Sequence, residues 1–359
     1  MMAGLHPLLE LSAQRGSRQQ ASDGSMPPGH NGPWQERETP LRNTGNWLQL
    51  FLWSYERTGS PNLKQAAERA ARFLLDTAHR PRGGAFLHRP DRPRQEGNGL
   101  IGQAWTLAAL FAGFRILGWE ELLATGQALL RCHDFDARLG LWSSLGLAGE
   151  TLGLNLTLNQ QVWFAAAALQ DPQPDEETVL RIRRFLACLP SHVRLSRSGR
   201  IEHRIHPLSL WRHFPAGWRS TLRSRRAQRF FGVERSVGYH AFVLHGLGQL
   251  VEQTSDDPGW DRRFVQRAMA YGESALHREE LRDNRFAYGY NPTGIEMAFA
   301  NFCFLPGSDR NGEAWLGEQF GRCYDAQAGM MALNSPDPAT LAGRICEAIR
   351  LPDMPVSLS

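Results

Sequence analysis

Apolar residues recur at steps of three and four along most of the chain, which is the spacing of amphipathic helices. In the segment LKQAAERAARFLLDT, residues 63–77, this spacing places Ala67, Ala71 and Leu74 on one face. The same pattern predicts further helices at 120–130, 176–188, 260–276 and 313–323. The protein is therefore expected to be mostly helical.

A second class of helical segment is more apolar and returns at a fixed interval. Trp47, Trp105 and Trp163 each lie in such a segment, and each Trp follows the previous one by 58 residues. Gln103 and Gln161 both stand two residues before their Trp. An interval of this size, with one apolar and one amphipathic helix in each copy, is typical of a helical-hairpin repeat.

Two looser copies of the repeat follow. Phe242 and Phe299 occupy the Trp position in VGYHAFVLHGLGQL and NPTGIEMAFANFCF, and the interval before Phe242 lengthens to 79 residues. A sixth hairpin is expected from a C-terminal helix at 339–349 together with an N-terminal helix at 8–14. An open array of repeats needs polar caps at its ends, whereas a closed ring hides both ends. We therefore expect a closed all-α ring.

The domain organisation follows from the repeats. Residues 1–22 are expected to form an N-terminal helix or arm, and residues 23–359 a single ring domain with an Arg-rich insertion at about 190–235. Three short pieces, AFLHR, RIEHRI and FAYGY, are expected to be β-strands in the connecting loops.

In such a ring the loops that lead into the inner helices meet at one mouth. The first of them, DGSMPPGHNGPW at 23–34, is too rich in Gly and Pro for a helix. We expect it to lie over the mouth as a lid or rim segment, and the alternative is an arm that only closes the ring.

Composition and charge exclude several classes of protein. The chain has 359 residues, of which 42% are hydrophobic, and a net charge of +4. Its five cysteines are scattered without metal-ligand spacing, so we expect reduced thiols and neither a metal nor a cofactor. No secretory signal is evident, and no apolar run is long enough for a membrane span, so a cytoplasmic location is expected.

Arginines concentrate between residues 194 and 235, where only Glu202 and Glu234 oppose them. This segment is either a solvated loop or a surface for a polyanion, because guanidinium groups suit carboxylates and phosphates. Docking to an anionic polymer, lipid or partner protein would use Arg223, Arg225, Arg226 and Arg229. Nucleic acid is not expected, since no recognised binding module accompanies the basic residues.

The repeat and its polar mouth resemble the six-hairpin (α/α)6 toroids of the glycosidase-like superfamily. The motifs DGSMPPGHNGPW, NGLIGQAW, NQQVWFAAAA, YGYNPTGIE and RICEAIRLPD are similar to those of bacterial toroids associated with exopolysaccharide and capsule biosynthesis clusters. This resemblance runs from about residue 23 to residue 353. It implies an (α/α)6 toroid that acts on an acidic polysaccharide or oligosaccharide.

Three reactions are compatible with the residues of the mouth. Glycosidase-type hydrolysis needs two carboxyl groups, for which Asp23 and Glu296 are the first candidates. A lyase or epimerase would instead use Tyr239 and His240 as acid and base. A non-catalytic polysaccharide-binding or scaffold protein is the alternative from another class.

The candidate substrate-binding residues come from the same loops and helix starts. They are His30, Asn31, Trp34, His88, Asn98, Gln103, Gln161, Tyr290 and Asn291. Simpler structural roles exist for several of them: the two glutamines could satisfy buried main-chain groups, and Glu296 could cap a helix.

Overall fold

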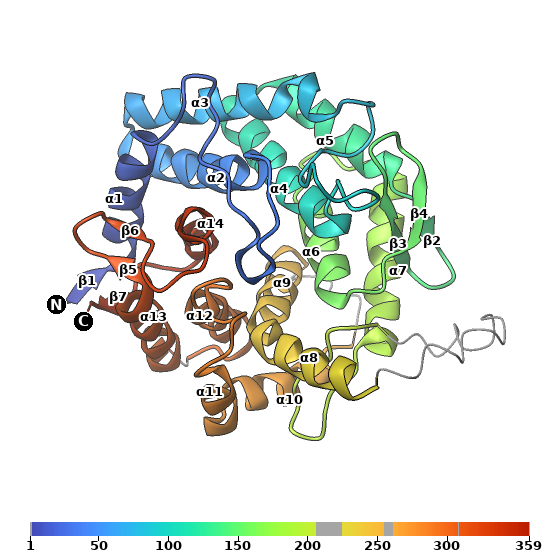
Figure 1. Ribbon diagram of the computed structural model, residues 1–359, viewed down its shortest axis with the longest axis vertical. Coiled ribbons are helices and arrows are strands. Elements are labelled where there is room, and N and C mark those ends of the chain that lie inside the picture. Colours follow the sequence, from blue (N-terminus) through green and yellow to red (C-terminus); the bar gives the residue numbers. More distant parts are fainter. Residues whose placement is uncertain (1, 206–224, 255–260, 308, 359) are drawn as a thin grey trace.

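The computed structural model describes residues 2–205, 225–254, 261–307 and 309–358, and in them the chain forms a ring of helices (Figure 1). The first five inner helices are α2 (Leu41–Thr58), α4 (Gly99–Leu117), α6 (Leu158–Ala168), α9 (His240–Gln253) and α12 (Thr293–Phe304). Their outer partners are α3 (Pro61–Leu75), α5 (Glu120–Cys132), α7 (Glu176–His192), α10 (Arg263–Gly272) and α13 (Asp309–Cys323). Two more helices, α8 (Arg225–Gly238) and α11 (Ala275–Leu281), flank α9 and α10.

The two ends of the chain close the ring. The short helix α14 (Pro338–Arg344) and the 3-10 helix η5 (Ile345–Arg350) take the sixth inner position, between α12 and α2. Helix α1 (Leu5–Ser17) packs outside them, against η5, α2 and α3. Strand β1 (Met2–Gly4) pairs antiparallel with β7 (Pro355–Ser357), so both termini lie together (Figure 1). The predicted all-α ring of six hairpins is confirmed.

The strands of the ring lie elsewhere than the sequence predicts. A three-stranded sheet contains β2 (Phe135–Asp136), β3 (Leu141–Leu145) and β4 (Thr151–Leu154), and β5 (Tyr324–Asp325) pairs with β6 (Met330–Met331). The prediction of strands at residues 85–89, 200–205 and 286–290 was wrong, because none of these described segments forms a strand. Residues 286–290 form turns in which Tyr288 has a φ of 37°, and Ile201 and Arg204 make only isolated bridges.

One helix among the described residues, α4, is long and apolar enough to cross a membrane by length and composition alone. It is an inner helix that contacts α2 on one side and α6 on the other, and most of it is buried. Its apolar character is therefore explained by packing inside the ring. The repeated aromatic position has the same cause: the Trp163 ring stacks on Phe242 of the next inner helix at 4.4 Å.

The repeated glutamines are main-chain clamps. Gln103 accepts a hydrogen bond from Phe86 N through Oε1 and donates through Nε2 to Phe86 O and Gly97 O. Gln161 makes the corresponding bonds to Trp142 N, Trp142 O and Asn155 O. Both side chains are fully buried and every amide atom is used, so their assignment to substrate binding is corrected to a structural role.

We expect Gln103→Leu to lower the free energy of unfolding by about 2–4 kcal/mol, because three buried main-chain groups lose their partner. Urea unfolding followed by circular dichroism measures the change. Gln14→Leu, at an exposed position of α1, is the matched control and should stay within about 0.5 kcal/mol of the wild type. Equal effects from the two substitutions would contradict the clamp.

Candidate functional site

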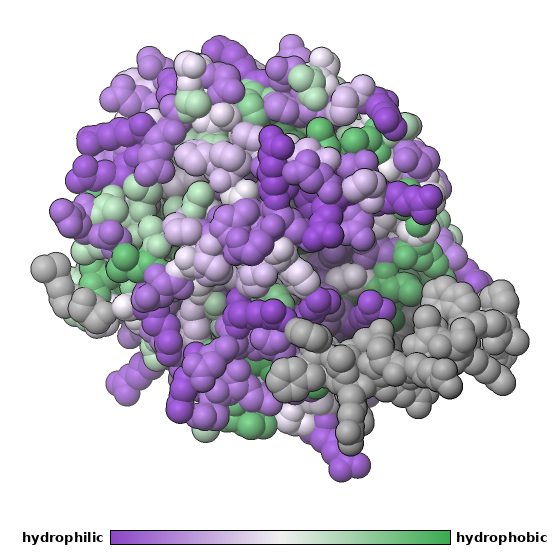
Figure 2. Space-filling model, in the orientation of Figure 1, coloured by the Kyte–Doolittle hydropathy of each residue, from purple (hydrophilic) through white to green (hydrophobic). Residues whose placement is uncertain are grey.

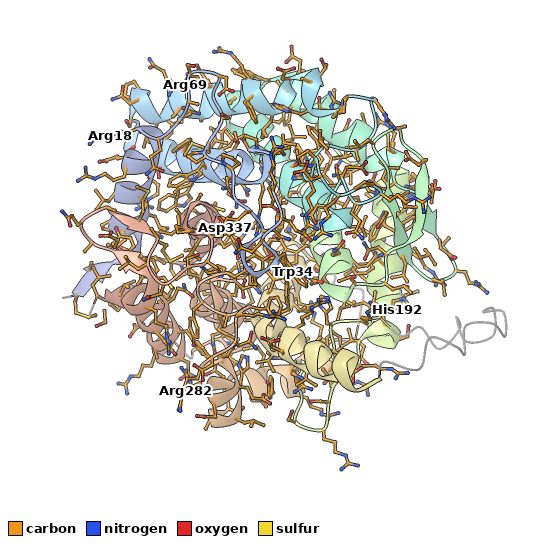
Figure 3. All side chains as sticks on the ribbon, viewed as in Figure 1. Arg18, Trp34, Arg69, His192, Arg282 and Asp337 are labelled. Carbon is orange, nitrogen blue, oxygen red and sulfur yellow. The ribbon has the colours of Figure 1, made fainter. Side chains whose placement is uncertain are left out.

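The loop before α2 covers the centre of the ring (Figure 1). Residues 29–38 form a compact loop whose neck is closed by a hydrogen bond from Glu38 N to Gly29 O at 3.3 Å. It contains the 3-10 turn η1 (Gly32–Trp34), flanked by Asn31 and Gln35 with φ values of 59° and 52°. Figure 3 places Trp34 and Asp337 near the middle of this face, and Figure 2 shows that the face is largely hydrophilic.

Four residues predicted for the site meet beneath this loop. Tyr290 Oη donates to Asn31 Oδ1 at 2.9 Å, and the Tyr239 ring lies 6.4 Å from the Tyr290 ring. Burial raises the pKa of Tyr239 well above its ordinary value, so its phenol is neutral at physiological pH. The Trp34 ring lies 5.5 Å from Phe286. These side chains hold the loop in place on the ring.

Below this cluster a single guanidinium holds two carboxyl groups. Arg344 Nη2 donates to Glu296 Oε1 at 2.8 Å, and Arg344 Nε donates to Glu347 Oε1 at 2.7 Å. Its Nη1 donates to Tyr290 O and to Asn291 Oδ1. Burial, and then the nearby Glu347, raise the pKa of Glu296 well above its ordinary value even though Arg344 opposes the change. Asn291 therefore orients Arg344, while burial and the ion pair with Arg344 act on the Glu296 carboxyl in opposite directions.

A cavity of about 30 Å³ lies on the ring axis next to this group. We call it the axial cavity. Its walls come from α2, α4, α6, α9 and η5. They include Asn46, Trp105, Trp163, His245, Gln249, Cys346 and Glu347. This volume suits a few water molecules and is too small for a sugar ring.

His245 is the notable residue of the axial cavity. Its side chain is fully buried between Trp163 and Phe299, with ring centroids 5.3 and 4.6 Å away, and neither ring nitrogen has a hydrogen-bond partner among the described residues. Burial lowers its pKa well below 6.5, and Arg350 and Arg344 lower it further. The imidazole is therefore neutral at physiological pH, and both of its ring nitrogens are open to a hydrogen bond with a ligand.

One other wall residue also has an unpaired atom. Glu347 Oε2 is buried and has no hydrogen-bond partner among the described residues. Buried polar groups are nearly always satisfied, so a set of unsatisfied groups around one cavity indicates a ligand or ordered water. Sequence reasoning missed His245, although it stands three residues after Phe242, one turn deeper on the same inner face.

Two of the predicted catalytic residues lie away from the axis. Asp23 is exposed, and its carboxylate accepts hydrogen bonds from Ser25 N and Ser25 Oγ, which lower its pKa. The carboxyl group placed next to Glu296 is thus Glu347 and not Asp23. His240 is buried, with Nδ1 accepting from Ile201 N and Nε2 bonded to Ala268 O. Both of its nitrogens are used by the main chain, so its role is structural.

The remaining predicted residues surround the covering loop. His30 N donates to Asp337 Oδ2 at 2.9 Å. His88 is buried against Thr106, and burial together with Arg89 lowers its pKa to about 3. Asn98 begins α4 with a φ of 56° and is also buried. None of these three lines the axial cavity.

The side chains of the arginines predicted for docking fall outside the part of the chain that the structure describes. Arg223 and the side chains of Arg225, Arg226 and Arg229 lie outside the described residues. Within the described part of the chain, no three His, Cys, Asp or Glu side chains gather in a way that could hold a metal ion.

We expect the free energy of unfolding to fall faster in the wild type than in His245→Phe as the pH decreases below 6.5. The unfolded histidine gains a proton near pH 6.5 while the folded one stays neutral, so the unfolded state binds more protons. The two profiles should diverge by up to about 1.4 kcal/mol per pH unit, measured by urea unfolding between pH 7 and 5. Gln14→Leu, which removes no titratable group, should follow the wild type. Parallel profiles for the wild type and His245→Phe would mean that His245 takes up a proton in the folded state as readily as in the unfolded state.

Comparison with solved structures shows the fold. Cellobiose 2-epimerase from Spirochaeta thermophila superposes with a TM-score of 0.65 over 96% of both chains, at 15% identity. The GH76A α-1,6-mannanase of a Salegentibacter species gives 0.59 over 96% of this chain and 98% of that chain, at 11% identity. An unsaturated glucuronyl hydrolase specific for heparin gives 0.58 over 96% and 95%, at 12% identity. These similarities identify the (α/α)6 toroid of sugar-processing enzymes.

Sequence comparison gives a nearer relative. No family model matches the chain. Archaeal glycosylation protein Q of Haloferax volcanii is 35% identical over 374 aligned positions, covering 99% of this chain and all of that protein. The link to exopolysaccharide clusters that the motifs suggested stays a prediction. At this identity and coverage, the chain belongs to the family of archaeal glycosylation protein Q.

Proposed function

We propose that the protein catalyses proton transfer at a carbon of a sugar, in the manner of an epimerase or isomerase, in the axial cavity. The observation that carries the proposal is His245, a buried imidazole without a hydrogen-bond partner among the described residues, on a cavity that also contains the unpaired Oε2 of Glu347. The toroid fold is shared with a cellobiose 2-epimerase and a D-mannose isomerase, which supports this class of reaction.

The roles follow from the chemistry of each group. His245 would take a proton from the carbon next to the carbonyl of a ring-opened sugar, which leaves an enediolate and an imidazolium. If the enediolate turns before the imidazolium returns the proton to the same carbon, the proton arrives on the opposite face and the product is the epimer. The free Oε2 of Glu347 lines the same cavity and would move the proton between the neighbouring oxygens. Trp105 and Trp163 would supply apolar walls for the sugar. Arg344 holds Glu347 in position.

A second candidate is glycoside hydrolysis by Glu296 and Glu347. The observation in its favour is that one guanidinium holds two carboxyl groups, and the pKa of Glu296 is raised as expected for a general acid. The α-1,6-mannanase and the glucuronyl hydrolase share the toroid. This second candidate includes an acidic sugar as its substrate. Only the sequence motifs suggest that the sugar is acidic. A non-catalytic sugar-binding protein is the remaining alternative.

The test incubates the purified protein with mannose, cellobiose or α-1,6-mannotetraose in D₂O and follows the products by NMR. We expect deuterium at the carbon beside the anomeric centre, together with the epimer or ketose. Because His245 carries the transfer, His245→Phe should reduce the rate at least a hundredfold, whereas His6→Gln should retain wild-type activity.

The other outcomes separate the alternatives. Cleavage of the tetrasaccharide without deuterium incorporation at carbon, abolished by Glu347→Gln but retained by His245→Phe, would replace the proposal with hydrolysis. Binding of the sugars without any product, in wild type and variants alike, would favour a binding protein.

A further inference from the structure

We propose that residues 29–38 are a lid that opens and closes over the axial cavity, and that Asp337 is its latch. This inference rests on the proposed function, since it explains how a sugar reaches a cavity of about 30 Å³. Three features of the molecule support it: the loop is a closed unit, one carboxylate holds it, and one layer of side chains joins it to the cavity wall.

The loop is built to move as one body. Its neck is closed by Glu38 N donating to Gly29 O at 3.3 Å and Glu36 N donating to His30 O at 2.7 Å. Within the loop, Asn31 Nδ2 donates to Glu36 Oε2 at 3.1 Å. A surface loop with its two ends joined in this way is an Ω loop, and its internal bonds survive a rotation about the neck.

Asp337 holds the loop through the main chain. Its Oδ2 accepts from His30 N at 2.9 Å and from Gly32 N at 3.1 Å, while its Oδ1 accepts from Thr340 N at the start of α14. These donors keep the pKa of Asp337 below its ordinary value in spite of burial, so it is a carboxylate. One charged side chain thus joins the loop to the sixth inner segment.

The backbone of the loop packs closely against the ring at two glycines. A Cβ added to Gly29 would stand 1.9 Å from Thr340 Oγ1, and one added to Gly32 would stand 2.2 Å from the Tyr290 ring. Glycine at both positions therefore allows direct contact of the loop backbone with the ring. Besides the packing of Trp34 near Phe286, the loop is held by backbone contacts and by hydrogen bonds, and the groups that make these bonds can bond to water when the loop lifts.

The ion pairs between the loop and the ring leave some buried polar atoms without hydrogen bonds. Glu36 pairs with Arg89 at 3.0 Å, but Glu38 reaches Arg42 at 3.5 Å, and neither Glu38 Oε1 nor Arg42 Nε has a hydrogen-bond partner. Burial raises the pKa of Glu38 above its ordinary value. The closed loop therefore leaves buried polar atoms unpaired, and opening would return them to water.

The lid is connected to the cavity through one layer of side chains. The Arg42 guanidinium lies 3.9 Å above the ring of Trp105, which is a wall of the axial cavity. Tyr290 contacts the loop through Asn31 and contacts Arg344 through its carbonyl oxygen. Lifting the loop would free Arg42 and Tyr290 to move, and so would open the cavity from above.

The experiment uses a native thiol as the probe. Cys346 lines the axial cavity and is buried. The protein is treated with iodoacetamide without any sugar, and the modification of each cysteine is followed by peptide mass spectrometry. In Asp337→Ala the rate at Cys346 is expected to rise at least tenfold. Cys323, which is buried in α13 outside the cavity, should keep its wild-type rate, and exposed Cys132 is the internal reference.

A matched variant controls for the loss of an aspartate. Asp325→Ala removes a carboxylate that caps a turn by accepting from Gln327 N and Ala328 N, away from the loop. It should leave the rate at Cys346 unchanged. Should Asp337→Ala fail to fold, Glu36→Gln weakens the contacts with Arg89 and Arg92 without touching α14, and a rise of about threefold at Cys346 is expected.

Two results would overturn the lid. The first is an unchanged rate at Cys346 in folded Asp337→Ala and Glu36→Gln proteins. The second is an equal increase at Cys346 and Cys323, which would mean that the whole ring loosens. Because labelling requires no turnover, an opened cavity in a protein that transforms none of the sugars would contradict the proposed function and leave the lid intact.

Discussion

The structure depends on Arg344 and the groups that it holds together. Its guanidinium binds Glu296 of α12, Glu347 of η5 and the carbonyl and amide oxygens of Tyr290 and Asn291 in the loop before α12. The sixth inner position contains a short helix and a 3-10 helix, and there the side-chain bonds of Arg344 add to the packing of these elements against α2 and α12. Removing one partner from such a buried network typically costs about 3–5 kcal/mol, because a charge is then left unpaired.

The same network places polar groups on an axis surrounded by apolar walls. Five inner helices contribute mainly Leu, Ala, Phe and Trp to the core, and at the repeated aromatic position Trp163 of α6 stacks on Phe242 of α9. The unsatisfied atoms of His245 and Glu347 are conspicuous in these surroundings, since their isolation from water favours the neutral imidazole and makes an unmet hydrogen bond costly. A site of this kind attracts a polar ligand that can satisfy several groups at once.

The N-terminal loop links ring closure to the site. It begins beside α1, crosses the centre of the ring and is held by Asp337 of the C-terminal segment, so both ends of the chain contribute to the same face (Figure 3). The comparison with archaeal glycosylation protein Q covers nearly the whole chain, which includes this loop. Residues 29–38, the axial cavity and the C-terminal segment that closes the ring are therefore considered together.

The sequence by itself determined the number and order of the hairpins, because a periodic apolar face is a local property that each helix must have in order to be buried. It also indicated that Asn31, Trp34, Tyr290, Asn291 and Glu296 belong near the mouth, since all of them lie in or just after loops that lead into inner helices. Only the tertiary structure decided their partners. Glu296 faces Glu347 and not Asp23, and His240 faces the main chain while His245 faces the cavity. These pairings join residues distant in the chain, and the five-residue step from His240 to His245 turns the helix far enough to exchange an outer environment for the axis.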